Sequence, residues 1–376
     1  MAVSKSFLGP NDKITTSQAA IFLNNAMLGA GILTLPRSVS ESVKTPDSWI
    51  SVLVGGLIAI LVVVLMLKLS LRFPGKTVFQ YTSAVIGRYP GMIWCLILVF
   101  YYIVIAGFEI RAMAEVTMYY LLEGTPIWAI TIPFIWLGAY LVIGGIDAIA
   151  RVSQIVFPIS LCILILSYLL SLRLFELDNL RPILGDGLGP VIHGLKSTVL
   201  VYSGCEVVMT LTAQLENPKQ ALKAVLTGVG IPIGLYLFTV IMVIGGVSVD
   251  SAVTSTWPTI DLVRSFEVTG FLFERFEFLL MVIWLMQMFC NYSCFFYNSS
   301  LGLSQLFKLP YKAVIFALVP VIFLVTMIPQ NMNELFGLGD AIGYLSILLF
   351  LLFPVFLSLL ALMRFGGGGG ARHEKS

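Results

Sequence analysis

The chain has 376 residues, of which 58% are hydrophobic and only 11% are charged, and its mean hydropathy is +0.97. A soluble globular domain carries about 25% charged residues, so this composition excludes a large soluble domain and indicates a membrane protein. The net charge of +2 at pH 7 also gives no reason to expect a nucleic-acid partner.

Ten apolar runs predict ten membrane-spanning helices and an all-α integral membrane protein, because roughly 20 apolar residues cross a bilayer. The first five runs lie at 14–36, 49–67, 92–122, 126–146 and 152–172, and the second five at 195–215, 224–249, 278–307, 313–328 and 341–363. The third and eighth runs are the longest. Lys and Arg residues fall two to one on the side of the N-terminus in this layout, which predicts that both termini are cytoplasmic.

The same layout predicts the domain organisation. It gives a cytoplasmic segment at 1–13, a first five-helix repeat at 14–172, an outer connection at 173–194, a second five-helix repeat at 195–363 and a flexible Gly-rich cytoplasmic tail at 364–376. An amphipathic stretch at 74–87 is expected on the cytoplasmic surface. A second outer connection, 251–277, is a candidate cap for an outer vestibule.

Two helix-breaking sequences stand at matching places in the two halves. The first span contains Gly29, Ala30 and Gly31, and the sixth contains Ser203 and Gly204. Each opens a set of five spans, and transporters built from inverted repeats place discontinuous helices at such positions. Glycine destabilises a helix interior, and an unwound segment frees amide and carbonyl groups that need partners. The pattern therefore predicts a 5+5 inverted repeat with discontinuous helices 1 and 6.

A ligand carboxylate bound at the start of a half-helix would satisfy such free amides. We therefore interpret Gly29, Ala30 and Gly31 as the core of a ligand-binding site. For the first span alone, close helix packing by small residues is the alternative explanation, and the matching break in the sixth span argues against it.

Three acidic residues and one arginine lie well inside spans, where charges usually face the bundle interior or a cavity. Arg111 and Glu115 are separated by one helical turn, so they are expected to pair, either for structure alone or in gating. Glu109 is a candidate contact for a ligand ammonium group or a proton-linked group. Glu206, at the sixth-span break, is a candidate for the same two roles. Alternatively, it accepts hydrogen bonds from the amides that the break frees.

Residues on three spans complete the candidate pocket. Asn291 is nearest the middle of the polar eighth span, Ile105 lies one turn before Glu109, and Ser203 opens the sixth-span break. Hydrogen bonding between helices is the alternative role for Asn291. No set of metal ligands and no nucleophile paired with a base is evident, so we expect no metal, no cofactor and no enzymatic activity.

Several motifs together resemble one family. They are 29–37 (GAGILTLPR), 108–115 (FEIRAMAE), 179–182 (NLRP), 185–190 (GDGLGP), 257–260 (WPTI) and 271–277 (FLFERFE). This combination resembles the B subunit of the spore germinant receptors of endospore-forming bacteria, within the amino acid–polyamine–organocation superfamily. The motifs at 108–115 and 179–190 most resemble its alanine-responsive branch.

The resemblance implies a leucine-transporter-like fold and a nutrient receptor in the inner membrane of the spore, acting with A and C subunits. It implies that a small amino acid such as L-alanine binds with its carboxylate at Gly29, Ala30 and Gly31, and that Glu109 matches the family's third-helix acid. A proton-coupled amino-acid transporter is the alternative, with Glu109 or Glu115 carrying the proton. A membrane enzyme lacks catalytic residues in this sequence, and a purely structural scaffold does not explain two broken helices.

Overall fold

The computed structural model describes residues 13–265 and 276–365, and these residues are almost entirely helical. The one extended pairing among them is an isolated bridge between Ile14 and Leu215. The expected Gly-rich tail and most of the N-terminal segment lie outside the described residues, as do residues 266–275 of the second outer connection.

The helices of the first half follow the predicted spans. Two helices are additional, because the first span is divided into two helices and the amphipathic stretch 74–87 forms a helix of its own. The helices of this half are α1 (Thr16–Met27), α2 (Gly31–Val43), α3 (Ser48–Leu71), α4 (Val78–Ile86), α5 (Arg88–Tyr120), α6 (Ile127–Ile143) and α7 (Gly145–Ser171). The first span is longer than predicted and is divided into α1 and α2, which are bent by 50°. The amphipathic stretch forms α4, which starts with a capping box between Thr77 and Gln80.

The second half is also helical. It contains α8 (Gly189–Val201), α9 (Val208–Leu211), α10 (Ala221–Thr254), α11 (Pro258–Arg264), α12 (Phe276–Phe307), α13 (Tyr311–Met327), α14 (Met332–Ser346) and α15 (Phe353–Phe365). A π-helical stretch, Ile347–Leu352, joins α14 to α15 into one long helix. The sixth span, predicted at 195–215, is discontinuous as expected: α8 stops at Val201, and short 3₁₀ turns surround the four-residue α9.

The described helices account for the ten predicted spans in different ways. Six helices are long and apolar enough to cross a membrane by themselves, and the bent pair α1–α2 makes a seventh span. Two further apolar helices, α6 and α13, have 17 residues each. The broken segment from α8 to α9 lies at the sixth position. The expectation of long third and eighth helices is confirmed, with 33 residues in α5 and 32 in α12.

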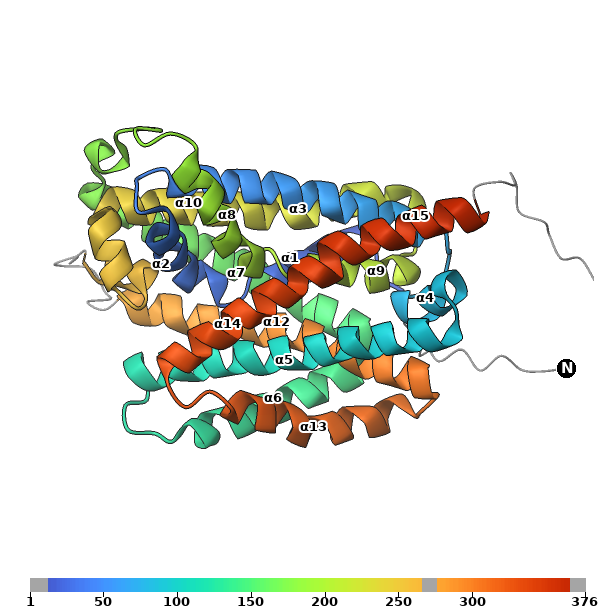
Figure 1. Cartoon of the computed structure of the whole chain (residues 1–376). Coiled ribbons are helices and arrows are strands. Elements are labelled where there is room, and N and C mark those ends of the chain that lie inside the picture. The colour runs from blue at the N-terminus through green and yellow to red at the C-terminus, as the bar shows by residue number, and fades with distance from the viewer. Residues whose placement is uncertain (1–12, 266–275, 366–376) are drawn as a thin grey trace, which may run out of the picture.

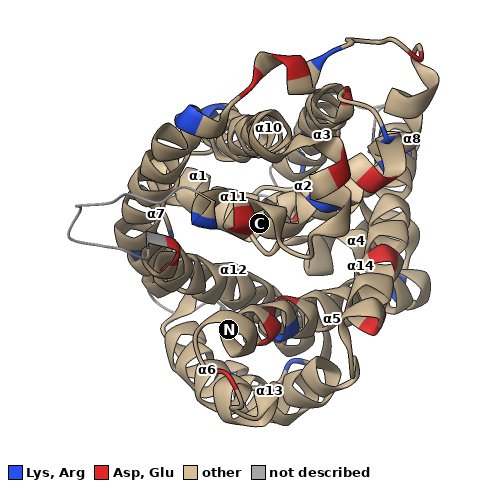
Figure 2. Cartoon of the chain, turned by 90° about the vertical axis from the view of Figure 1, so that its left-hand side faces the viewer, with Lys and Arg blue, Asp and Glu red and all other residues tan. Residues whose placement is uncertain are grey.

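The helices form an elongated bundle in which α1 and α12 are central (Figure 1). In that view α3 and α10 run along one side, α5, α6 and α13 run along the other, and the α14–α15 helix crosses between them. α12 packs against α5 and α7, and α1 packs against α10. Seen end-on, the helix bodies are mostly uncharged, and the charged residues gather at loops and helix ends (Figure 2).

Buried polar groups help to join these helices, as the sequence suggested for the eighth span. The Tyr292 hydroxyl on α12 donates a 2.7 Å hydrogen bond to the Phe134 carbonyl on α6. A side chain at Gly138 would overlap the Tyr292 hydroxyl. Close contact and hydrogen bonding thus replace the hydrophobic driving force that is absent between helices in lipid.

Candidate functional site

The first break exposes amide groups at the start of α2. Leu28 has non-helical backbone angles (φ −87°, ψ 82°), and α2 begins three residues later at Gly31. The Ala30 amide donates a 2.9 Å hydrogen bond to the Oε2 atom of Glu109 on α5. Glu109 is only 7% exposed. A buried carboxyl group therefore lies at the N-terminus of α2, where the helix dipole is positive.

Gly29 allows this carboxylate to approach the chain closely. A Cβ atom at Gly29 would lie 2.5 Å from Oε1 of Glu109 and 2.6 Å from its Oε2. Any side chain at this position would therefore push Glu109 away from the Ala30 amide. This contact is the physical reason for glycine at Gly29, and it goes beyond simple flexibility of the break.

The carbonyl groups at the end of α1 are bound by an amide side chain from α12. The Nδ2 atom of Asn291 donates to the carbonyl oxygens of Asn25, at 2.9 Å, and Ala26, at 3.0 Å. Asn291 was predicted to face the ligand pocket. The structure places it at the end of α1, where it satisfies carbonyls that the broken helix leaves without amide partners.

The next two carbonyls are bound from α10 and α12. The Tyr236 hydroxyl donates to the Met27 carbonyl at 2.6 Å, and Gln287 Nε2 donates to the Leu28 carbonyl at 3.4 Å. Sequence reasoning missed Tyr236. The available signal was a tyrosine hydroxyl in the middle of the otherwise apolar run 224–249, where it needs a buried partner.

The second break lies directly against the first. Gly204 has a left-handed backbone (φ 98°), and a Cβ atom there would overlap the carbonyl oxygen of Ala26. Glu206 is fully buried, and its Oε2 accepts a 2.7 Å hydrogen bond from the Gly204 amide. In the sequence analysis, hydrogen bonding to an amide freed by the break was the alternative to a ligand or proton role for Glu206. The structure shows that hydrogen bond. The Ser203 hydroxyl bonds the Leu200 carbonyl.

One small cavity joins most of the predicted site residues. Its volume is about 20 Å³, and its lining includes Gly29, Gly31, Ile105, Glu109 and Ser203. Ala30 and Gly204 contribute backbone groups beside it, whereas Asn291 is not among its lining residues. The volume is enough for roughly one water molecule, so a larger ligand can enter only if the surrounding side chains move.

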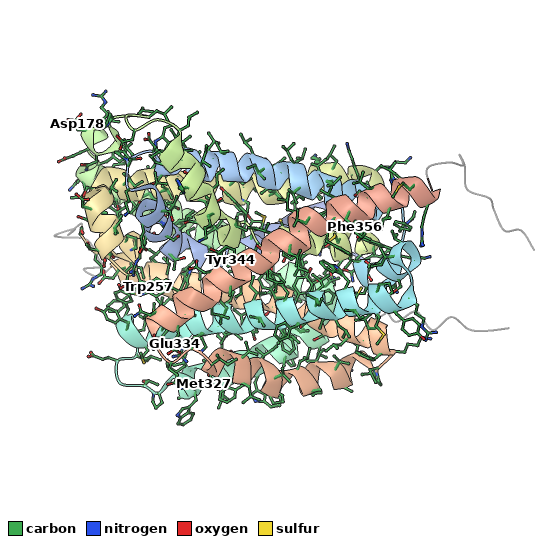
Figure 3. All side chains as sticks on the ribbon, viewed as in Figure 1. Asp178, Trp257, Met327, Glu334, Tyr344 and Phe356 are labelled. Carbon is green, nitrogen blue, oxygen red and sulfur yellow. The ribbon has the colours of Figure 1, made fainter. Side chains whose placement is uncertain are left out.

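A larger cavity leads to this site from the end of the bundle opposite Ile14. We call this the outer end, following the orientation expected from the Lys and Arg residues. The cavity has a volume of about 530 Å³, and Trp257 and Tyr344, both labelled in Figure 3, line it. Four residues line both this outer vestibule and the small cavity: Thr34, Phe108, Leu200 and Val201. These four side chains therefore separate the vestibule from the breaks.

Part of the second outer connection borders the vestibule, as its sequence suggested. Trp257 precedes α11 and lines the cavity. The Thr259 hydroxyl in α11 donates to the Ile32 carbonyl in α2 at 2.9 Å. This segment is therefore fastened to the half-helix that carries the first break, while the motif at 271–277 lies almost entirely outside the described residues.

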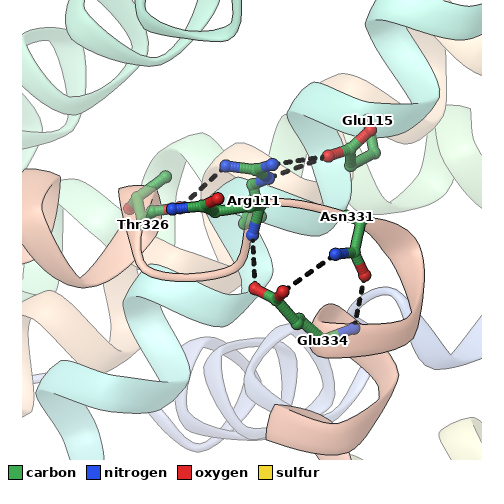
Figure 4. Close-up of polar contacts among 6 residues, drawn as sticks. Arg111, Glu115, Thr326, Asn331 and Glu334 are labelled. Atoms are coloured by element: carbon green, nitrogen blue, oxygen red, sulfur yellow. Dashed lines mark hydrogen bonds and ion pairs between the residues drawn. The ribbon is translucent and has the colours of Figure 1, made fainter.

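Arg111 and Glu115 form the predicted pair. The Nε and Nη2 atoms of Arg111 each lie 2.9 Å from Oε1 of Glu115, and both side chains are buried. Arg111 Nη1 also lies 3.5 Å from the Thr326 carbonyl, close to where Asn331 and Glu334 cap α14 (Figure 4). Neither residue lines the small cavity. Through the Thr326 carbonyl, Arg111 links α5 to the end of α13.

No group of three or more His, Cys, Asp or Glu side chains with the geometry of a metal site occurs within residues 13–265 and 276–365. The polar groups in and around the small cavity are backbone groups, one carboxylate and a few hydroxyl and amide groups.

Known structures with the same fold are transporters. The structure of MhsT in complex with L-phenylalanine aligns with a TM-score of 0.68 at 13% identity, covering 93% of this chain and 89% of MhsT. The nucleobase–cation symporter Mhp1, in a closed conformation with bromovinylhydantoin bound, aligns with a TM-score of 0.65 at 14% identity, covering 91% of this chain and 79% of Mhp1. These likenesses show the fold, and they confirm the expected leucine-transporter-like arrangement.

Sequence relatives are spore germination proteins. Spore germination protein YndE of Bacillus subtilis is 43% identical over 94% of this chain and 98% of its own length. Spore germination protein A2 of the same organism is 34% identical over 94% of this chain and 96% of its own length. The family described as "Spore germination protein" matches residues 13–335. This polytopic membrane protein with two broken helices therefore belongs to the spore germination protein family.

Proposed function

We propose that the chain is the nutrient-sensing membrane subunit of a spore germinant receptor and binds a small amino acid at the first helix break. The observation that carries this proposal is the Ala30 amide, which holds a buried carboxylate beside a cavity reached from the outer vestibule. An α-amino acid presents a carboxylate and an ammonium group. The amides of α2 suit the first, and the carbonyls at the end of α1 suit the second.

The small volume at the breaks supports a small ligand. Ile105 and Val201 line this cavity, and even after the surrounding side chains move, the limited space favours a ligand with a short side chain such as L-alanine. Binding would act by favouring one of two pre-existing conformations, in proportion to the difference in affinity for the two. The hinge would be the contact between the two breaks, where Gly204 meets Ala26.

The remaining features of the proposal concern location and partners, and the family and the distribution of Lys and Arg support them. The chain works in the inner membrane of the spore with both termini cytoplasmic, and it passes the signal to A and C subunits of the receptor. The relatives' membership in spore germination supports this assignment.

Thermal unfolding of the purified protein against a panel of amino acids tests the ligand. We expect one or a few small amino acids to raise the melting temperature. Gly31→Leu should abolish this rise, because a Cβ atom at Gly31 already lies 3.0 Å from Val201 and 3.2 Å from the Tyr236 hydroxyl. Gly230→Leu on α10 is the matched control, since nothing lies within 4 Å of a Cβ atom there. If no amino acid raises the melting temperature, alone or with the partner subunits present, the ligand assignment is wrong.

A proton-coupled amino-acid transporter is the second candidate. The observations that favour it are the transporter fold and the vestibule that leads from the outer end to the breaks. Uptake of a labelled amino acid into proteoliposomes under a pH gradient separates the two candidates. A receptor binds the amino acid without accumulating it, whereas a transporter concentrates it inside the vesicles.

A further inference from the structure

Two acids at the breaks, Glu109 and Glu206, are buried with no cationic partner among residues 13–265 and 276–365, and of the two only Glu109 lines the small cavity. The described part of the chain has ion pairs at Arg111–Glu115, Arg151–Asp147 and Arg181–Asp178, none of which includes Glu109. Its hydrogen-bond partner is the Ala30 amide at the start of α2. The carboxylate lies flat against Gly29, where a Cβ atom would meet both of its oxygens.

The carbonyl groups on the other side of the break also have hydrogen-bond partners within the chain. Asn291 and Tyr236 donate to the Asn25, Ala26 and Met27 carbonyls. Both kinds of group that an amino acid would use, amides for its carboxylate and carbonyls for its ammonium, therefore already have partners from the chain itself. The cavity of about 20 Å³ beside them has no room for an amino acid in addition.

We propose that Glu109 is a built-in substitute for the ligand carboxylate, which holds the Ala30 amide in the unliganded state and is displaced when an amino acid binds. This inference rests on the proposed function, since it names the group that the amino acid replaces. It explains why a helix can stay broken inside a membrane without ligand, because the substitute satisfies the freed amide. It also makes the ligand compete with an intramolecular carboxylate, so that only a molecule with a carboxylate of its own takes over the contact.

Chemical rescue tests the substitute directly. Glu109→Ala removes the carboxylate, leaves the Ala30 amide without a partner and enlarges the cavity by most of one side chain. We expect a lower melting temperature, which acetate or propionate restores in a concentration-dependent manner. Acetamide at the same concentrations should restore little, because the α2 N-terminus favours an anion.

Two controls define the specificity of the rescue. Met113→Ala shortens a side chain of similar length that is also buried on α5, away from the cavity, and acetate should not restore its melting temperature. The wild-type protein should show no shift with acetate, since Glu109 fills the position. Equal shifts in all three proteins, or no shift in folded Glu109→Ala, would overturn the proposal.

Glu109→Gln keeps the proposal testable if Glu109→Ala does not fold. Its side-chain carbonyl still accepts from the Ala30 amide, but without the charge that strengthens the bond. We expect the amino acid to bind Glu109→Gln roughly tenfold more tightly than the wild type, because a weaker competitor is displaced. Unchanged or weaker binding would count against the substitute.

The outcomes separate this inference from the proposed function. If acetate restores Glu109→Ala but no amino acid stabilises the wild type, the substitute is supported and the amino-acid assignment fails. If an amino acid stabilises the wild type but acetate does not restore folded Glu109→Ala, the substitute fails and the amino-acid assignment remains supported.

Discussion

Gly204→Ala is the sharpest test of the paired helix breaks. Gly204 has φ 98°, a left-handed conformation that costs an L-residue about 1–2 kcal/mol. The added Cβ atom would also overlap the carbonyl oxygen of Ala26 and lie 2.6 Å from its carbonyl carbon. Backbone atoms have little freedom to move away, so the first break must shift as well. We expect the free energy of unfolding to fall by about 3 kcal/mol or more in total.

The same chemical change elsewhere in the chain should have the opposite sign. Gly230 lies inside α10, and nothing is within 4 Å of a Cβ atom there. Alanine is favoured over glycine in a helix by roughly 0.5–1 kcal/mol, so Gly230→Ala should leave stability unchanged or raise it. Thermal unfolding of the detergent-purified proteins, followed by tryptophan fluorescence, measures both. If Gly204→Ala melts at or above the wild-type temperature, then Gly204 does not combine a left-handed backbone with a close contact to Ala26.

Three further predictions concern the groups around the breaks. Asn291→Leu removes the donor for two carbonyls of α1, and we expect a loss of about 2 kcal/mol in thermal unfolding; an unchanged melting temperature would contradict its role at α1. Arg111→Met leaves Glu115 buried without its partner and should cost about 3–5 kcal/mol. Arg151→Met removes an exposed arginine from a carboxylate that also accepts a hydrogen bond from Gln18, and should cost less than about 1 kcal/mol. Similar melting shifts for the two would show that the α5 pair is not buried. Thr259→Val removes the hydrogen bond from α11 to α2, and hydrogen exchange by mass spectrometry should become faster in residues 31–43; unchanged exchange would mean that α11 does not fasten α2.

The small cavity is a closed site, and the outer vestibule is the route that leads to it. Thr34, Phe108, Leu200 and Val201 stand between the two cavities and come from three helices, α2, α5 and α8. Opening therefore requires these side chains to move apart, and we expect a shift of the helices that carry them to widen the gap further. The bends at the two breaks are the natural places for that movement, because freed backbone groups there exchange partners more easily than a continuous helix does.

The sequence alone determined the membrane class, the approximate positions of ten spans and the two places where helices break. These features are local: a run of apolar residues must lie in lipid, and glycines inside such a run weaken a helix wherever it packs. The pairing of Arg111 with Glu115 was also predictable, because both lie one turn apart on the same helix.

Only the tertiary structure decided which groups meet at the breaks. The partners of the first break come from Glu109, Tyr236 and Asn291, which are about 80 to 260 residues away along the chain. Spacing along one helix cannot show which way a side chain on another helix points, so Tyr236 was missed and Asn291 was assigned to the pocket. The role of Glu109 was likewise open in the sequence, because an acid within a span can bind a ligand, a proton or a free amide. The fold brings it to the Ala30 amide, since an unwound helix inside a membrane needs a partner for every group that it frees.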